Sequence, residues 1–123
     1  MAAKKQHALR FWLNKQGIVC AKGPWPKTKA ASLNASIRKW QAIVGWLEEG
    51  REVNSCGHCA TCALCQYNIV KANGTCTTSC PVGVKTRKGG CYGTPYDDWE
   101  DTFEPYEKLA AAKAEVAFLE SLR

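Results

Sequence analysis

Cysteines crowd one short part of this 123-residue chain. Seven of its eight cysteines lie between Cys56 and Cys91, and the first four of these recur at every third residue. The chain shows no export signal, so we expect it in the reducing cytosol, where cysteines at such density serve metal binding or redox chemistry. The spacing therefore predicts a metal site that holds the middle of the chain in shape.

The intervals between these cysteines are typical of zinc sites. Two residues separate Cys62 from Cys65, which is the interval at which one turn directs both thiolates to a single ion. A second pair follows at a slightly wider interval, and a fifth cysteine lies beyond it. The predicted zinc ligands are Cys62, Cys65, Cys76, Cys80 and Cys91, with Cys56 and Cys59 as further candidates.

An iron-sulfur cluster is the alternative to zinc. The run from Cys56 to Cys65 and the pair Cys80-Pro81 both resemble fragments of bacterial ferredoxins, whose cysteines hold 4Fe-4S clusters. In ferredoxins three residues precede the last cysteine of the run, whereas here the Cys-Pro pair lies 15 residues beyond Cys65. Zinc is therefore favoured, while a 4Fe-4S cluster with a redox-sensing role, disulfides and free thiols stay open.

The sequence as a whole predicts a small α-rich domain. Apolar residues at helical spacing indicate helices over residues 4–15, from a cap at Asn34 or Ser36 to Gly50, and from Pro105 to Leu122. Residues 51–96 show no lasting helix or strand period, so their irregular structure depends on the metal. We expect one domain, residues 1–123, with little β structure and three parts: a basic helical part (1–50), a cysteine-rich metal-binding segment (51–96), and an acidic linker with a C-terminal helix (97–123).

Charge is distributed unevenly along the chain. The formal net charge is +6, yet residues 1–47 carry nine Lys or Arg and no acid, whereas residues 95–123 carry eight acids and three bases. A basic half concentrates polyanions such as nucleic acid near the protein. Alternatively, the two oppositely charged ends attract each other within the fold.

Basic residues with an aromatic among them give the first functional hypothesis. It is a non-enzymatic binding protein that acts on nucleic acid or on a complex that processes nucleic acid. Lys and Arg side chains bind phosphates, and an indole ring stacks on an unpaired base. The predicted nucleic-acid-binding residues are Lys22, Trp25, Lys27, Lys29, Arg38 and Lys39.

The acidic aromatic run over residues 96–106 gives the second hypothesis. It is an inhibitor that docks on a host protein of defence or transcription and imitates nucleic acid. Its carboxylates would stand in for phosphates, and its aromatic rings would anchor the contact. The residues predicted to bind the protein partner are Asp97, Asp98, Trp99, Glu100 and Asp101, with Phe103 and Tyr106 as further aromatic anchors.

Three sequence motifs carry a resemblance to known proteins. They are Cys62-Ala63-Leu64-Cys65, the stretch from Cys76 to Cys80-Pro81-Val82, and Gly90-Cys91-Tyr92-Gly93-Thr94-Pro95-Tyr96-Asp97-Asp98-Trp99. Over residues 36–122 the chain is similar to a group of small cysteine-rich proteins of tailed phages and bacterial genomes, a group without an assigned activity. The resemblance implies a phage-type protein of the host cytoplasm whose five motif cysteines make one metal site.

Catalysis finds little support in the sequence. No Ser or Cys has a recognisable base partner, His7 and His58 are the only histidines, and no glycine-rich loop that would cradle phosphate occurs. Zinc saturated by cysteines keeps no open position for a substrate. Nowhere do 18 consecutive apolar residues indicate a membrane span. We therefore expect neither an enzyme nor a membrane protein.

Overall fold

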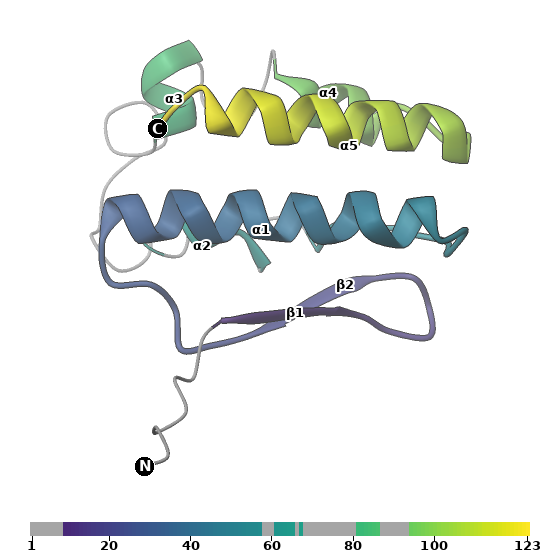
Figure 1. The fold of residues 1–123 in the computed structure, drawn as a ribbon, viewed down its shortest axis with the longest axis horizontal. Coiled ribbons are helices and arrows are strands. Elements are labelled where there is room, and N and C mark those ends of the chain that lie inside the picture. The colour runs from purple at the N-terminus through teal and green to yellow at the C-terminus, as the bar shows by residue number, and fades with distance from the viewer. Residues whose placement is uncertain (1–8, 58–60, 66, 68–80, 87–93) are drawn as a thin grey trace.

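The computed structural model describes residues 9–57, 61–65, 67, 81–86 and 94–123. This part of the chain is α-rich, as predicted, with one two-stranded sheet. The hairpin lies on one side of α1, and α5 runs antiparallel to α1 on its other side (Figure 1). The elements are β1 (Arg10–Leu13), β2 (Val19–Lys22), α1 (Lys29–Glu48), α2 (Ala63–Cys65), α3 (Pro81–Thr86), α4 (Pro95–Glu100) and α5 (Pro105–Glu120).

The helix predicted over residues 4–15 is wrong in its described part, where the chain forms β1. β1 pairs antiparallel with β2, with Trp12 opposite Cys20. Phe11 and Leu13 alternate with the outward-facing residues and pack against the hydrophobic core. Over only four residues, the alternation of a strand and the spacing of a helix look much alike in the sequence. The packing of Phe11 and Leu13 against the core decides in favour of the strand.

A tight turn joins the two strands and attaches them to the chain that follows α1. Asn14 Oδ1 accepts hydrogen bonds from the backbone N–H groups of Gln16 and Ile18, both at 2.9 Å. Gly17 has a φ of 77°, which residues with a side chain rarely adopt. The backbone N–H of Asn54 donates to the Gly17 carbonyl at 2.7 Å. The turn therefore positions the hairpin as well as closing it.

Helix α1 is the predicted central helix, but it begins earlier than expected, at Lys29. Its N-cap is Thr28, whose Oγ1 accepts a hydrogen bond from the Ala31 backbone N–H at 3.0 Å. Gly50, with a φ of 85°, follows the last turn and ends the helix as predicted. The extra turns at the start bring Lys29 and its neighbours onto the helix.

The C-terminal helix is confirmed, with Pro105 as its first residue. Tyr106, in its first turn, is 83% exposed and takes no part in the contact with α1. The contact with α1 is made by another face, because the small side chains of α5 let the two helices approach closely there. The buried residues of α5 are Ala111, Ala112, Glu115 and Leu119.

The segment expected to be an acidic linker contains a short helix, α4. Its Trp99 is 1% exposed and belongs to the main hydrophobic core. Asp98 and Glu100, on either side of this ring, are exposed. The alternation of a buried ring with exposed carboxylates explains why the segment looks like a solvated linker in the sequence.

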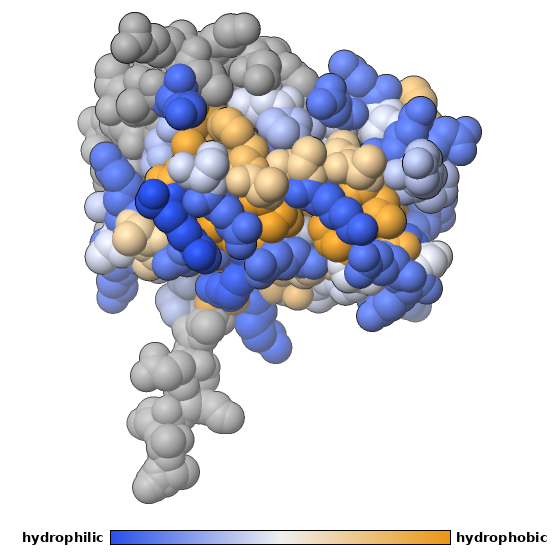
Figure 2. Space-filling model, turned by 45° about the horizontal axis from the view of Figure 1, so that its top comes forward, coloured by the Kyte–Doolittle hydropathy of each residue, from blue (hydrophilic) through white to orange (hydrophobic). Residues whose placement is uncertain are grey.

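The surface that Figure 2 shows has no single broad apolar face, because hydrophilic side chains separate the hydrophobic ones. Within the residues that the structure describes, we find no helix with the length and apolar character needed to cross a membrane.

Candidate functional site

The outer face of the hairpin combines positive charge with an exposed indole ring. Arg10 lies opposite Lys22, and Trp12 lies opposite Cys20. Residues opposite each other in antiparallel strands point to the same side of the sheet, so these four side chains share one face. Trp12 is 42% exposed, both cations are exposed, and Cys20 is half-buried. The face therefore offers two cations and an accessible aromatic ring.

Further exposed cations lie in the segments next to the two strands. They are Lys15 in the hairpin turn, Lys27 just before the N-cap of α1, and Lys29, the first residue of α1. No acid occurs between residues 9 and 47, so nothing in this part of the chain offsets the positive charge. Of the residues predicted to bind nucleic acid, Lys22, Lys27 and Lys29 thus lie at the surface, together with Arg10 and Trp12, which the sequence analysis missed.

Among the described residues, no ion pair joins a cation of the basic half to an acid of the C-terminal part, although the charge of Lys39 acts on Glu115. The ion pair found there has the opposite sense, because the acid is Glu48 on α1 and the cation is Lys113 on α5. Its atoms lie 3.4 Å apart, and both side chains are more than half exposed. Within the described part of the chain, no ion pair is found for the exposed cations Arg10, Lys15, Lys22, Lys27 and Lys29.

Two other predicted residues take part in packing. Trp25 is half-buried and packs against the small cluster of Leu9, Ala35 and Ala63. Arg38 is exposed, and its Nη1 donates a hydrogen bond to the Leu9 carbonyl at 3.4 Å. Both residues therefore fasten the start of the hairpin to α1, and only part of the Trp25 ring is open to a ligand.

The prediction that Lys39 binds phosphate is wrong, because this side chain is buried. Lys39 is 3% exposed, and its Nζ lies 5.6 Å from the centroid of the Trp40 ring. Ser36 and Ile43, three residues before and four after Lys39, are buried as well. The helical period of α1 was the signal that places Lys39 on the inner face.

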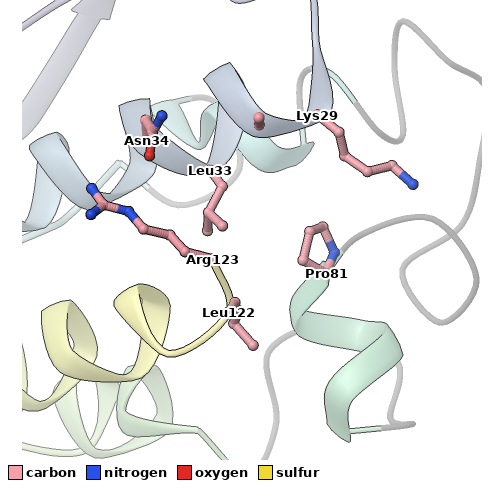
Figure 3. Close-up of a pocket in the computed structure, with 7 residues that line it drawn as sticks. Lys29, Leu33, Asn34, Pro81, Leu122 and Arg123 are labelled. Atoms are coloured by element: carbon pink, nitrogen blue, oxygen red, sulfur yellow. The ribbon is translucent and has the colours of Figure 1, made fainter.

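A hollow of about 610 Å³ opens beside the first turns of α1 (Figure 3). Leu33, Pro81 and Leu122 give it an apolar lining, and Lys29 and Arg123 supply positive charge. The charged ends of Lys29 and Arg123 extend in different directions (Figure 3). The hollow therefore combines an apolar lining with positive charge from the start of α1 and the C-terminal Arg123.

The predicted metal ligands lie only partly within the described residues. Cys59, Cys76, Cys80 and Cys91 fall outside them, as does the side chain of Cys65 in α2. Cys56 is buried, and its thiol lies 3.9 Å from the Tyr96 hydroxyl, whereas Cys62 is half-buried. Among the described side chains, no three His, Cys, Asp or Glu residues gather to hold an ion. The metal site stays a prediction.

Helix α5 carries a buried carboxylate that the sequence analysis missed. Glu115 on α5 is 4% exposed, and its Oε1 has no hydrogen-bond partner. Burial is the main cause that raises the pKa of Glu115 to about 8, and negative charge on Cys62 raises it too. Lys39 and a hydrogen bond from the Tyr96 backbone N–H act in the opposite direction. The groups that shift this pKa therefore come from α1, the start of α4 and the residue before α2.

The residues predicted to bind a protein partner divide into exposed carboxylates and a buried ring. Asp98, Glu100 and Asp101 are exposed, whereas the side chain of Asp97 lies outside the described residues. Trp99 was predicted to anchor the partner, and this is wrong, because a ring that is 1% exposed presents no surface to another protein.

The other two predicted anchors are the most exposed large apolar side chains of the described chain. Phe103 is 88% exposed and Tyr106 is 83% exposed. Two hollows of about 260 and 280 Å³ both include Phe103 and Lys108 in their lining. Another, of about 360 Å³, is lined by Tyr106 with Asp98 and other residues. This acidic aromatic surface is thus uneven, with rings beside hollows.

Comparison with known proteins adds no relative. No protein-family model, no curated protein and no solved structure matches this chain. The hairpin face and the acidic aromatic surface are therefore the features of this chain that bear on its function.

Proposed function

We propose that this protein is a non-enzymatic binding protein that holds single-stranded nucleic acid on the outer face of the β1–β2 hairpin. Arg10 and Lys22 bind phosphates, and Trp12 stacks on an unpaired base. One observation carries the proposal: Trp12, 42% exposed, shares its face of the sheet with these two exposed cations.

The exposed ring favours an unpaired strand over a duplex. In a duplex the faces of the bases are stacked on each other, whereas a single strand presents them to aromatic side chains. Arg10 and Trp12 are two residues apart on β1, which separates them by about 7 Å along the strand. A cation and a ring are therefore available side by side, one for the backbone and one for the base.

The surroundings of the hairpin support the same proposal. Lys15, Lys27 and Lys29 add exposed positive charge, and residues 9–47 contain no acid. Such a surface attracts a polyanion over a distance comparable to the Debye length, about 8 Å at physiological salt. Arg38 and Trp25 have packing roles as well, and the buried Lys39 has no part in this surface.

Fluorescence anisotropy with labelled oligonucleotides tests the proposal. We expect the protein to bind oligothymidine or oligouridine better than a duplex of equal length, with an affinity that falls steeply as salt is raised. Lys22→Glu should weaken binding strongly, whereas Lys85→Glu, the same change at an exposed position of α3, should weaken it much less. The proposal is lost if no binding occurs at low salt, if binding is indifferent to salt, or if the two variants behave alike.

A second candidate function is docking on a host protein that itself binds nucleic acid. It is supported by the exposure of Phe103 and Tyr106 beside the carboxylates of Asp98 and Asp101. Exposed aromatic rings are the side chains that most often anchor protein interfaces, and carboxylates around them repel nucleic acid while attracting a basic protein surface. The hairpin and the acidic aromatic surface belong to different layers of the fold (Figure 1).

A pull-down from nuclease-treated host lysate separates the two candidates. Docking predicts a protein that is captured by the wild type and by Trp12→Ala but not by the double variant Phe103→Ser/Tyr106→Ser. Because both rings are more than four-fifths exposed, the double variant should fold normally. Docking is contradicted if no captured protein depends on these two rings.

A further inference from the structure

We infer that copies of this chain associate head to tail, with the hairpin face of one copy seated on the acidic aromatic surface of the next. Cations and a ring on the first surface then meet carboxylates and rings on the second. The inference goes beyond the proposed function, because the association needs no nucleic acid and is measured in its absence. Either one can fail without the other.

The two surfaces lie on opposite sides of α1. Phe11 and Leu13 pack against the core, so Arg10 and Trp12, which alternate with them along β1, face away from it. Helix α5 lies on the other side of α1 from the hairpin, and α4 packs on α5 (Figure 1). A contact between the hairpin face and the acidic aromatic surface therefore needs two molecules.

The charges of the two surfaces are complementary and are not used up by ion pairs in the described part of the chain. Among the described residues, no ion pair is found for Arg10 or Lys22 on the hairpin face, or for the exposed Asp98 and Asp101. Lys108, the cation nearest to these acids in the sequence, has its Nζ 4.3 Å from the centroid of the Trp99 ring. The hairpin face of another copy is therefore a basic surface that matches these carboxylates in sign.

One hollow on the acidic aromatic surface has the lining that a lysine or arginine side chain requires. Asp98 and Asp101 contribute carboxylates to the hollow of about 360 Å³, and Tyr106 contributes a ring. Alanine side chains of α5 complete much of the lining. The aliphatic stem of Arg10 or Lys22 from the next copy would lie along these alanines, with its charged end among the carboxylates and beside the ring.

Only a head-to-tail arrangement brings unlike surfaces together. In a two-fold symmetric dimer the same surface meets itself, so cations would oppose cations, or carboxylates would oppose carboxylates. Exposed rings add apolar contact at both surfaces, from Trp12 on one and from Phe103 and Tyr106 on the other. Because the two surfaces lie on opposite sides of the molecule, each added copy leaves one surface of each kind free, and open chains of molecules form.

Sedimentation velocity of the full chain tests the association directly. The protein is purified free of nucleic acid and under reducing conditions, so that neither a bridging strand nor a disulfide links the copies. At low salt we expect the average mass to rise with protein concentration beyond that of a dimer. In about 1 M salt, where the Debye length is about 3 Å, it should return to that of a single chain. A single chain at every concentration in low salt overturns the inference, as does an association that is indifferent to salt.

Complementary variants test which surfaces meet. Arg10→Gln/Lys22→Gln removes the cations of the hairpin face, and Asp98→Asn/Asp101→Asn removes carboxylates of the acidic aromatic surface. All four side chains are exposed, so both variants should fold. Each variant alone should associate at least about tenfold more weakly than the wild type, because interfacial charge contacts are lost. An equimolar mixture should form pairs and nothing larger, since one intact surface of each variant remains.

Matched controls carry the same changes of charge at other exposed positions. They are Lys85→Gln/Lys113→Gln and Glu49→Gln/Glu120→Gln, and both should associate within about twofold of the wild type. The inference is overturned if the mixture of the two interface variants forms no pairs, or if each of them alone associates as the wild type does. It is overturned as well if the controls lose association to the same extent, because net charge rather than these two surfaces would then govern it.

Discussion

Trp40 and Trp99 meet edge to face, with ring centroids 5.2 Å apart and ring planes at 85°. This contact joins α1 to α4, two helices that are separated in sequence by the whole cysteine-rich segment. Tyr96 adds a second edge-to-face contact with Trp40, at 6.2 Å. The aromatic cluster gives α4 a fixed place against α1, and α4 in turn packs on α5. The cluster therefore ties the helices on the two sides of the cysteine-rich segment to each other.

Replacing Trp99 should destabilise the fold, whereas replacing Phe103 should not. Trp99→Ala removes a ring that is 1% exposed, and such a loss costs about 3–5 kcal/mol. Phe103→Ala removes a ring that is 88% exposed, for which we expect a change within about 0.5 kcal/mol. Urea unfolding followed by circular dichroism measures both. Similar losses for the two variants would contradict the assignment of Trp99 to the core.

The long helices were predictable because their signals are local. The stripe that contains Trp40 and the left-handed Gly50 identify α1, and Pro105 marks the start of α5. The start of α1 was missed because its N-cap, Thr28, comes directly after a loop rich in proline. In the sequence, Thr28 therefore looks like part of that loop. β1 was missed because four residues are too few to distinguish the two-residue period of a strand from the 3.6-residue period of a helix. Only the packing of its side chains against the core distinguishes the two.

In the candidate sites, too, the sequence predicted what depends on local signals and missed what depends on packing. The sequence predicted the exposed cations, since charge is visible in any residue list. It could not predict that Trp12 faces outward, because this follows from the strand pairing that sets Trp12 opposite Cys20. Glu115 and Lys39 occupy inner faces of their helices, and the periodicity that buries them was present in the sequence. Their charge made them look like surface residues.

The hairpin turn should tolerate no side chain at Gly17. A Cβ there would lie 2.7 Å from Asn54 Nδ2 and 2.9 Å from the Glu52 carbonyl, in addition to the strain of a φ of 77°. Gly50 has a φ of 85° and no atom within 4 Å of an added Cβ, so Gly50→Ala measures the cost of the backbone strain without a steric clash. We therefore expect Gly17→Ala to lower the unfolding free energy by clearly more than the about 1 kcal/mol of Gly50→Ala. Equal losses in chemical unfolding would argue against the contact between the turn and Asn54.

Stability of the metal-free chain should fall as pH rises, because of Glu115. The folded chain keeps the proton on Glu115 up to a pKa of about 8, whereas the ordinary value is 4.5. Stabilisation that is complete below pH 4.5 is therefore lost as pH rises towards 8, by at most about 5 kcal/mol. Unfolding in urea with a chelator present, at several pH values, measures this slope. Glu115→Gln should flatten it, and an equally steep slope in that variant would rule out Glu115 as its source.

Ring and charge on the hairpin face should contribute to nucleic-acid binding in separable ways. Trp12→Ala removes stacking, so we expect a loss of about 1–3 kcal/mol of binding free energy that changes little with salt. Lys22→Ala removes a phosphate contact, so the slope of log affinity against log salt should fall by about 0.7. Trp12→Phe keeps an aromatic surface and should recover part of the affinity.

The matched control for both changes is Lys113→Ala, which removes a cation from α5. It should reduce affinity less than Lys22→Ala does, because Lys113 already pairs with Glu48 and lies outside the hairpin. Anisotropy titrations at several salt concentrations give affinity and slope for each variant. If Trp12→Ala changed the salt slope while Lys22→Ala did not, the assignment of the ring to bases and the cation to phosphates would be reversed. If neither variant differed from Lys113→Ala, binding would have to occur on another face of the molecule.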